Sequence, residues 1–186
     1  MKFCSECGVR LPGRTSGPWP RVACERCGAV FYLSPRLAAA CIAYRDDRVL
    51  LCRRAVDPGY GMWSLPGGFV EKGESVASGA AREFLEEAGV VVEIARPYAL
   101  FRVARGHQMH VVYLAKLLDT AFRPGAESLE AALFDESGVP WNHLAFASTR
   151  EALRRYFGDR RRGVFGFLYA EIMPFAPAVQ GDWANA

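Results

Sequence analysis

Most of the chain alternates between apolar and polar positions in the way that β-strands do. Two apolar runs, 37–44 and 48–54, flank a turn at Asp46-Asp47 and predict a pair of adjacent strands. The prolines and glycines between 55 and 67 indicate a loop with one short extended piece. Further strands are expected at 90–94, 98–103, 107–118 and 129–136.

Two segments have helical patterns instead. Residues 75–88 begin at Ser75, a favourable N-cap, and end before Gly89, which suits a left-handed C-terminal cap. Residues 146–157 carry apolar side chains at helical spacing. Strands on both sides of a helix in the chain predict an α/β sandwich with a mixed sheet.

The first 34 residues differ in composition from the rest of the chain. They are rich in Gly, Pro and Arg and lack long apolar runs, so this segment needs a metal ion to fold. We place a boundary at Ser34-Pro35 and expect a main domain over 36–173. The apolar stretch from 164 onward is expected to pack on that domain, with 174–186 as a C-terminal tail.

Composition narrows the class of protein. The chain has 186 residues, about half of them apolar, which suits one folded domain with a small appendage. No apolar run approaches the roughly 20 residues of a membrane helix, and the N-terminus lacks a signal-peptide pattern, so a cytoplasmic protein without membrane contact is expected. The formal charge of +3, taken as spread along the chain, does not by itself imply a nucleic-acid partner.

Four of the six cysteines are paired as C-x2-C. Sixteen residues separate the pair Cys4 and Cys7 from the pair Cys24 and Cys27, which is the spacing of a zinc ribbon. Four thiolates leave no open coordination position, so the zinc ion is expected to be structural, with a redox-active pair as the alternative. The other two cysteines lie in apolar strands and are interpreted as buried small residues.

An acidic cluster lies in the second half of the first predicted helix. Glu83, Glu86 and Glu87 are at i, i+3 and i+4, so they share one helix face. Hard carboxylate oxygens in that number suit Mg²⁺ or Mn²⁺, and Arg82 and Glu74 are placed to pair. The alternative is an ordinary solvated acidic face. Two features argue against it: no Lys or Arg lies at i+4 of these residues, and Gly79 within the helix indicates close packing against a loop.

These residues are part of a motif that resembles a known family. Residues 68–90 match the Nudix box, Gly-x5-Glu-x7-Arg-Glu-apolar-x-Glu-Glu-x-Gly-apolar, at every specified position. With the cysteine pairs, the LPGGF entry to the box and the later AESLEAALFDE and PWNHLAFAS, the chain resembles the zinc-ribbon Nudix hydrolases. That group contains NADH pyrophosphatase-like and ADP-ribose or FAD pyrophosphatase-like enzymes, and the resemblance implies a Nudix α/β/α sandwich after a zinc ribbon.

The resemblance also implies roles for particular residues. The Mg²⁺ or Mn²⁺ ligands would be Glu83, Glu86 and Glu87, together with the Gly67 carbonyl and, from outside the box, Glu130. Glu127 is the second choice for the outside carboxylate, since it reads as an exposed loop residue. The supporting pair would be Arg82 and Glu74, and either Glu83 or Glu86 would take the proton of the attacking water.

The implied reaction splits the pyrophosphate bond of a nucleoside diphosphate that is linked to another moiety, such as ADP-ribose, FAD or NADH, and releases AMP. The SQPWPFPxS stretch of NADH pyrophosphatase-like enzymes is missing, and so is the proline that many ADP-ribose pyrophosphatases carry about sixteen residues after the box, which leaves the substrate open. Residues considered for substrate binding are Arg53, Arg54, Trp63, Phe69 and Phe146.

A binding module is the second class of function. Six arginines fall between 150 and 162, and zinc ribbons often bind nucleic acid, so a nucleic-acid or nucleotide binding protein on a Nudix scaffold is the alternative. A solvated helix end is the preferred interpretation of these arginines. Nudix enzymes of this kind often form homodimers, and nothing in the sequence decides the oligomeric state.

Overall fold

The structure is a computed structural model that describes residues 2–11, 21–32, 34–103 and 107–172. The chain divides into two compact units, Met1–Pro35 and Arg36–Ala186. The expected tail at 174–186 lies outside the described residues. No helix in the part of the chain that the structure describes is long and apolar enough to cross a membrane.

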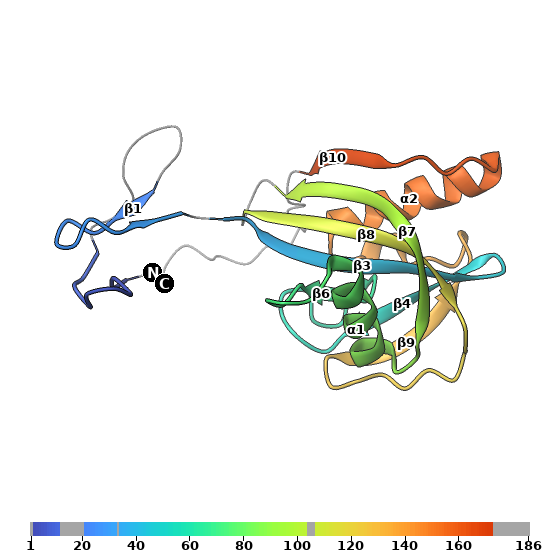
Figure 1. The fold of residues 1–186 in the computed structure, drawn as a ribbon. Helices are drawn as coiled ribbons and strands as arrows, with labels where there is room; N and C mark the ends of the chain where they lie inside the picture. Colours follow the sequence, from blue (N-terminus) through green and yellow to red (C-terminus); the bar gives the residue numbers. More distant parts are fainter. Residues whose placement is uncertain (1, 12–20, 33, 104–106, 173–186) are drawn as a thin grey trace. The chain divides into compact units, whose positions relative to one another are not determined.

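The N-terminal unit is built from two similar turns and a small hairpin (Figure 1). Strands β1 (Val22–Ala23) and β2 (Val30–Phe31) are antiparallel, and Phe3 bridges Arg10 in the same sense. Among its described residues, 2–11, 21–32, 34 and 35, four side chains form a buried core, and two of them are metal-ligand candidates: Cys4, Leu11, Val22 and Cys24. So few apolar contacts agree with a unit whose fold depends on its cysteines.

The second unit is organised around a mixed sheet. Its strands run in the order β10-β7-β8-β3-β4-β5, while β6 pairs with β3 and β9 with β4. Two pairings, β3 with β8 and β10 with β7, are parallel, and the others are antiparallel. The strands are β3 (Arg36–Arg45), β4 (Arg48–Arg54), β5 (Trp63–Ser64), β6 (Gly67–Phe69), β7 (Val92–Val103), β8 (Gln108–Leu117), β9 (Ser128–Phe134) and β10 (Leu168–Ile172).

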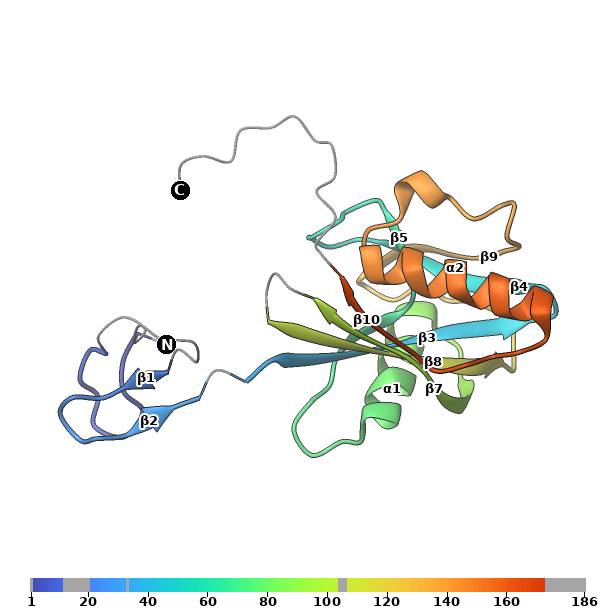
Figure 2. The ribbon, with the colours of Figure 1, turned by 90° about the horizontal axis from the view of Figure 1, so that it is seen from above.

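Two helices cover opposite faces of this sheet (Figures 1 and 2). Helix α1 (Val76–Ala88) packs on one face and α2 (Ala147–Arg162), which follows a short 3-10 turn at Trp141–His143, packs on the other. Adjacent residues of β3 face opposite sides of the sheet: Cys41 belongs to the core under α1, and Ile42 belongs to the core under α2. The predicted α/β/α sandwich with a mixed sheet is therefore confirmed.

Two of the elements that differ from the sequence prediction are β7 and α2. Strand β7 is continuous where two strands were expected, because register shifts on either side of Arg96-Pro97 accommodate a proline that has no N–H to donate. Helix α2 continues five residues beyond Phe157. Its charged last turn hid the pattern, but Asp159 is fully buried there and accepts a 2.9 Å hydrogen bond from the Tyr98 hydroxyl.

Candidate active site

Helix α1 begins and ends at the residues that the sequence indicates. The Ser75 hydroxyl accepts a hydrogen bond from the Ser78 N–H at 3.0 Å, which caps the N-terminus. Gly89 adopts φ 71° and donates its N–H to the Leu85 carbonyl at 2.9 Å. These caps fix where the helix starts, and therefore which of its carboxylates face the sheet.

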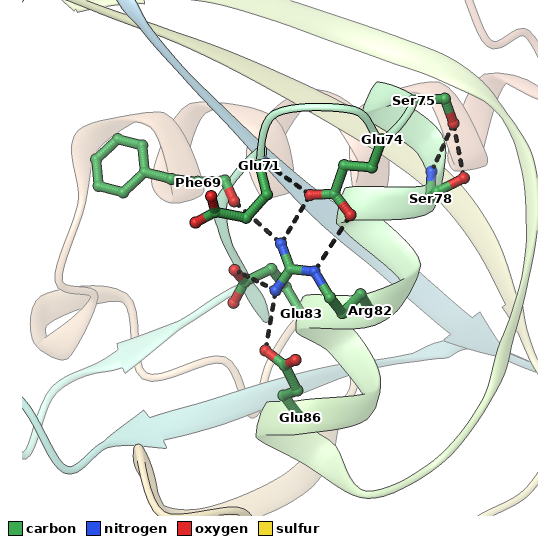
Figure 3. Close-up of polar contacts among 8 residues, drawn as sticks. All are labelled: Phe69, Glu71, Glu74, Ser75, Ser78, Arg82, Glu83 and Glu86. Carbon is green, nitrogen blue, oxygen red and sulfur yellow. Dashed lines mark hydrogen bonds and ion pairs between the residues drawn. The ribbon is translucent and has the colours of Figure 1, made fainter.

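Arg82 joins the helix to the loop that precedes it (Figure 3). Its Nε and Nη2 donate to the two carboxylate oxygens of Glu74 at 3.2 and 2.9 Å, and Nη2 also donates to the Phe69 carbonyl at 3.1 Å. Its Nη1 donates to Glu83 Oε1 at 2.9 Å and to Glu86 Oε2 at 3.0 Å. Arg82 therefore supplies the positive charge beside the acidic face. It lies four residues before Glu86, whereas the sequence analysis considered only positions four residues after each glutamate.

Glycines allow the loop to approach the acidic face. A Cβ atom at Gly68 would lie 2.4 Å from the Glu83 carboxyl carbon, so only glycine leaves room for that side chain. A Cβ at Gly79 would lie 2.8 Å from Glu74 Oε1. The expectation that Gly79 marks close packing of the helix against a loop is confirmed.

The three glutamates of the acidic face differ in environment. The Glu87 side chain is buried, with 6% of the residue exposed, and this burial raises its pKa to about 8; the negative charges of Glu83 and Glu127 add to the effect. Burial also raises the pKa of Glu83, although hydrogen bonds from Arg82 oppose it. Glu86 is exposed on the outer side of the helix. The cluster therefore holds two carboxylates whose charged forms are only partly compensated, by Arg82 at Glu83 and by Arg54 at Glu87, and would gain from a bound cation.

The two candidates for an outside carboxylate lie in different surroundings. The negative charge of Glu127 makes a small contribution to the raised pKa values of both Glu83 and Glu87. Glu130, in β9, lies 4.0 Å from Arg53 across the pairing with β4. The residue preferred from the sequence is thus oriented toward an arginine, and the second choice is the one close to the cluster. The sequence analysis ranked Glu127 second because its position before β9 is typical of an exposed loop residue.

A protein-family model matches the part of the chain that contains this helix and loop. The NUDIX domain model matches residues 34–157, which include the whole acidic helix and its preceding loop. The chain belongs to the NUDIX family. Nudix enzymes hydrolyse pyrophosphate bonds with the help of divalent cations, and the expectation from the Nudix box is confirmed at this level.

Relatives and solved structures agree. An ADP-ribose pyrophosphatase of Methanocaldococcus jannaschii is 34% identical over 119 residues, 62% of this chain and 69% of that protein. An NAD-capped RNA hydrolase NudC of Chromobacterium violaceum is 32% identical over 164 residues, 87% of this chain but only 60% of that protein. The crystal structure of a NUDIX hydrolase from Nitrosomonas europaea is 41% identical with a TM-score of 0.87, covering 93% of this chain and 99% of that one.

Only some of the residues considered for substrate binding lie together near the end of β4. Arg54 Nε donates to the Pro58 carbonyl at 2.9 Å. Its guanidinium lies 5.0 Å from the centre of the Phe146 ring. The positive charge of Arg54 also lowers the pKa of Glu87. Trp63 packs edge-on against Phe134 at 4.9 Å, beside the core. Phe69 is covered by Arg36, 3.3 Å from the ring centre. Arg54 and Phe146 are therefore together, whereas Trp63 and Phe69 have structural partners.

The histidines form no shared metal site among the described residues. The sequence predicted a strand that begins at His107, but His107 is a turn residue with φ 49° just before β8. His110 lies within hydrogen-bond distance of the Ser148 hydroxyl, at 3.1 Å, and of Gln108 Oε1, at 2.9 Å.

The arginines of α2 are largely engaged within the fold. Arg155 and Arg162 both bond to buried Asp159, Arg161 bonds to Glu136, and Arg160 donates to the Asp46 carbonyl. Phosphates would have to compete with these interactions, so the stretch from 150 to 162 gives little support to a nucleic-acid patch. A solvated helix end, the interpretation preferred from the sequence, describes these residues better.

The four cysteines of the N-terminal unit converge. Their Sγ atoms all lie within 4.8 Å of one another, with Cys4 to Cys27 at 3.6 Å and Cys7 to Cys24 at 3.5 Å, well beyond the roughly 2.05 Å of a disulfide. No other group of three or more such ligands converges in this way within the described ranges. The carboxylates of the acidic face do not converge on one point as the cysteines do, because one oxygen of Glu83 and one of Glu86 accept hydrogen bonds from Arg82.

Proposed function

We propose that this Nudix enzyme hydrolyses the pyrophosphate bond of a nucleoside diphosphate linked to another moiety, such as ADP-ribose, FAD or NADH, and releases AMP and a second phosphomonoester. The observation that carries the proposal is the acidic face of α1, where buried Glu87 has a raised pKa and Arg82 holds Glu83 and Glu86. A buried carboxylate of this kind is typical of a functional site.

The donor set fits a hard divalent cation. We propose that Glu83, Glu86 and Glu87 hold Mg²⁺ or Mn²⁺ with the Gly67 carbonyl and with Glu127 in place of Glu130. The raised pKa values of Glu83 and Glu87 support this, because a cation would stabilise their charged forms. When bound, the ion neutralises the diphosphate and lowers the pKa of the attacking water.

The protein's own side chains then hold the reacting groups in position and transfer the proton. Arg82 fixes Glu83 in the space left by Gly68, so that this carboxylate is held beside the loop. Of the two candidates for the base, Glu83 is favoured, because Arg82 and the space left by Gly68 hold its carboxylate in one position, whereas Glu86 is exposed. Arg54 lies close enough to affect Glu87 and offers a positive charge to a phosphate group.

Glu127→Gln is expected to lower turnover about 10- to 100-fold, and Glu130→Gln less than about twofold. The reason is that Glu127 acts electrostatically on Glu83 and Glu87, whereas exposed Glu130 is paired with Arg53. The two substitutions are chemically identical and three residues apart, so each controls for the other. Steady-state kinetics at several Mg²⁺ concentrations would measure both; the reverse order of effects would restore Glu130 as the ligand.

We further propose that the four cysteines bind one structural Zn²⁺. Their mutual distances and the matching glycine turns at Gly8 (φ 70°) and Gly28 (φ 76°) support a four-sulfur site. Since the unit has few apolar contacts, the metal would provide most of its folding free energy.

Cys24→Ser is accordingly expected to release zinc and to expose the amide hydrogens of the N-terminal unit to exchange, while amides in β3, β8 and α1 stay protected. Elemental analysis and hydrogen-exchange mass spectrometry would measure these two effects. Cys52→Ser is the control, because Cys52 is buried under α1 and its thiol lies 3.7 Å from the Glu87 carbonyl. Purified wild-type protein without zinc, with its thiols oxidised, would refute the site.

Substrate identity is the least constrained part of the proposal. Relatives named as an ADP-ribose pyrophosphatase and an NAD-capped RNA hydrolase support an adenylate conjugate. The missing SQPWPFPxS stretch places NADH below ADP-ribose and FAD. A panel of these compounds and deoxynucleoside triphosphates, assayed with Mg²⁺ and with Mn²⁺, tests this order. Much faster cleavage of the triphosphates would refute the substrate class and leave the metal site in place.

A further inference from the structure

The loop between β8 and β9, residues 118–127, runs across the C-terminal end of α1. Its backbone donates two hydrogen bonds to the last turn of that helix. The Arg123 N–H bonds to the Ala88 carbonyl at 2.9 Å, and the Gly125 N–H bonds to the Glu87 carbonyl at 3.2 Å. Since the last four carbonyls of a helix have no partner within it, this loop completes the hydrogen bonding of the helix end.

Two glycines allow the loop and the helix end to approach so closely. A Cβ atom at Gly89 would overlap the Arg123 carbonyl oxygen and lie 2.7 Å from the Arg123 Cβ. A Cβ atom at Gly125 would overlap the Glu86 carbonyl oxygen and lie 3.1 Å from the Glu86 carbonyl carbon. Gly125 lies outside the left-handed region, so lack of space alone excludes a side chain there.

The outside carboxylate, Glu127, is attached to this contact through the backbone. The Gly125 carbonyl accepts the Ser128 N–H at 3.0 Å, which closes a turn around Glu127. The Glu127 carbonyl accepts the Ala55 N–H at 2.8 Å, just beyond the end of β4. The backbone that carries Glu127 is therefore held from one side by the helix end and from the other by the residue that follows β4.

The helix is more firmly packed than the loop. Ala80, Phe84 and Ala88 are fully buried against the sheet, and Arg82 ties the helix to the loop that precedes it. Most of residues 118–127 are exposed. A methyl group added between the two is thus expected to push the loop outward, together with its carboxylate, and to leave the helix in place.

We propose that Gly125 is a positioning residue that sets the distance between the Glu127 carboxylate and the carboxylates of α1. It acts through Glu127 and contacts neither the metal ion nor the substrate. The inference rests on the proposed metal site and extends it to a residue outside the Nudix box.

Gly125→Ala and the matched variant Gly166→Ala test the proposal in the full-length, zinc-loaded protein. Both glycines are half-buried and lie outside helices, strands and the left-handed region, but a Cβ atom at Gly166 would meet only the flexible end of Arg155, at 3.4 Å. Gly125→Ala is expected to lower kcat about tenfold and to weaken Mg²⁺ binding, whereas Gly166→Ala should change either by less than about twofold. Initial rates of AMP release from ADP-ribose and calorimetric Mg²⁺ titration measure these effects, and urea unfolding shows whether the variants are folded.

A double-mutant cycle shows whether Gly125 acts through Glu127. In the Glu127→Gln background, Gly125→Ala is expected to cost less than about threefold, because the carboxylate that it displaces has already lost its charge. Independent effects would multiply, so the same tenfold loss in both backgrounds, about one power of ten each, would overturn the proposal. Wild-type turnover and Mg²⁺ affinity in Gly125→Ala would overturn it as well.

A milder change decides the matter if Gly125→Ala does not fold. Pro124→Gly adds no atom at the helix end but frees the backbone next to Gly125. It should raise the Mg²⁺ concentration for half-maximal rate about two- to fivefold without lowering the rate at saturation, and an unchanged Mg²⁺ requirement would refute the proposal.

Mg²⁺ titration also separates this proposal from the proposed reaction, because it needs no substrate. A wild-type protein that binds Mg²⁺ but releases no AMP would refute the reaction alone. In that case, weaker Mg²⁺ binding by Gly125→Ala than by Gly166→Ala would support the positioning role, and equal binding would overturn it.

Discussion

Replacement of Glu86 by Gln is expected to lower turnover by about a thousandfold or more, with little change in the free energy of unfolding. Glu86 is exposed and accepts one hydrogen bond from Arg82 at 3.0 Å, which the amide oxygen of Gln can still accept. The substitution therefore removes a metal-binding charge and keeps the local contact. Initial rates of AMP release and a urea unfolding curve measure the two effects. Glu87→Gln is expected to lose turnover in the same way.

Glu93→Gln is the matched control for this substitution. Glu93 is an exposed residue of β7, outside the Nudix box, and its amide should leave turnover within about twofold of the wild type. If Glu86→Gln and Glu87→Gln both behaved like the control, the helix would carry only a solvated acidic face.

Arg82→Lys is expected to cost about 10- to 100-fold in turnover and to weaken Mg²⁺ binding, although the charge is kept. Arg82 makes five hydrogen bonds to four different residues, and three of its acceptors are carboxylates. The single nitrogen of Lys cannot reach Glu74 and Glu86 in the same geometry. Calorimetric Mg²⁺ titration separates loss of metal affinity from loss of turnover.

Arg102→Lys provides the comparison, because Arg102 forms a single exposed ion pair with Glu171 at 3.1 Å. It should change neither turnover nor metal affinity by more than about twofold. Equal behaviour of the two Lys variants would show that Arg82 serves as a general positive charge and does not position the glutamates.

The sequence predicts the catalytic helix well because its signals are local. Ser75 and Gly89 mark the two caps, and the spacing of Glu83, Glu86 and Glu87 places them on one face whatever surrounds the helix. The cysteine pairs are local signals too, since their spacing alone brings four sulfurs together in a ribbon. In such cases the residues that determine the structure lie within one short segment.

Other features depend on contacts between distant segments and were missed or ranked lower. Glu127 was only the second choice for the outside carboxylate, because its influence on Glu83 and Glu87 depends on the pairing of β9 with β4. The last turn of α2 is held by the bond between Asp159 and Tyr98, which are 61 residues apart. Strand β7 passes through a proline because β8 tolerates two register shifts opposite it. Each of these three features depends on contacts between segments that are far apart in the sequence.

The measurement that tests the central claim most directly is the release of AMP from ADP-ribose as Mg²⁺ is added to zinc-loaded wild-type protein and to Glu86→Gln. A metal-dependent Nudix site predicts no turnover without the added cation, saturable turnover with Mg²⁺ or Mn²⁺, equal amounts of AMP and ribose 5-phosphate, and almost none of either in the variant. The same turnover with and without added cation, or in wild type and variant alike, would contradict the assignment of catalysis to the acidic face of α1.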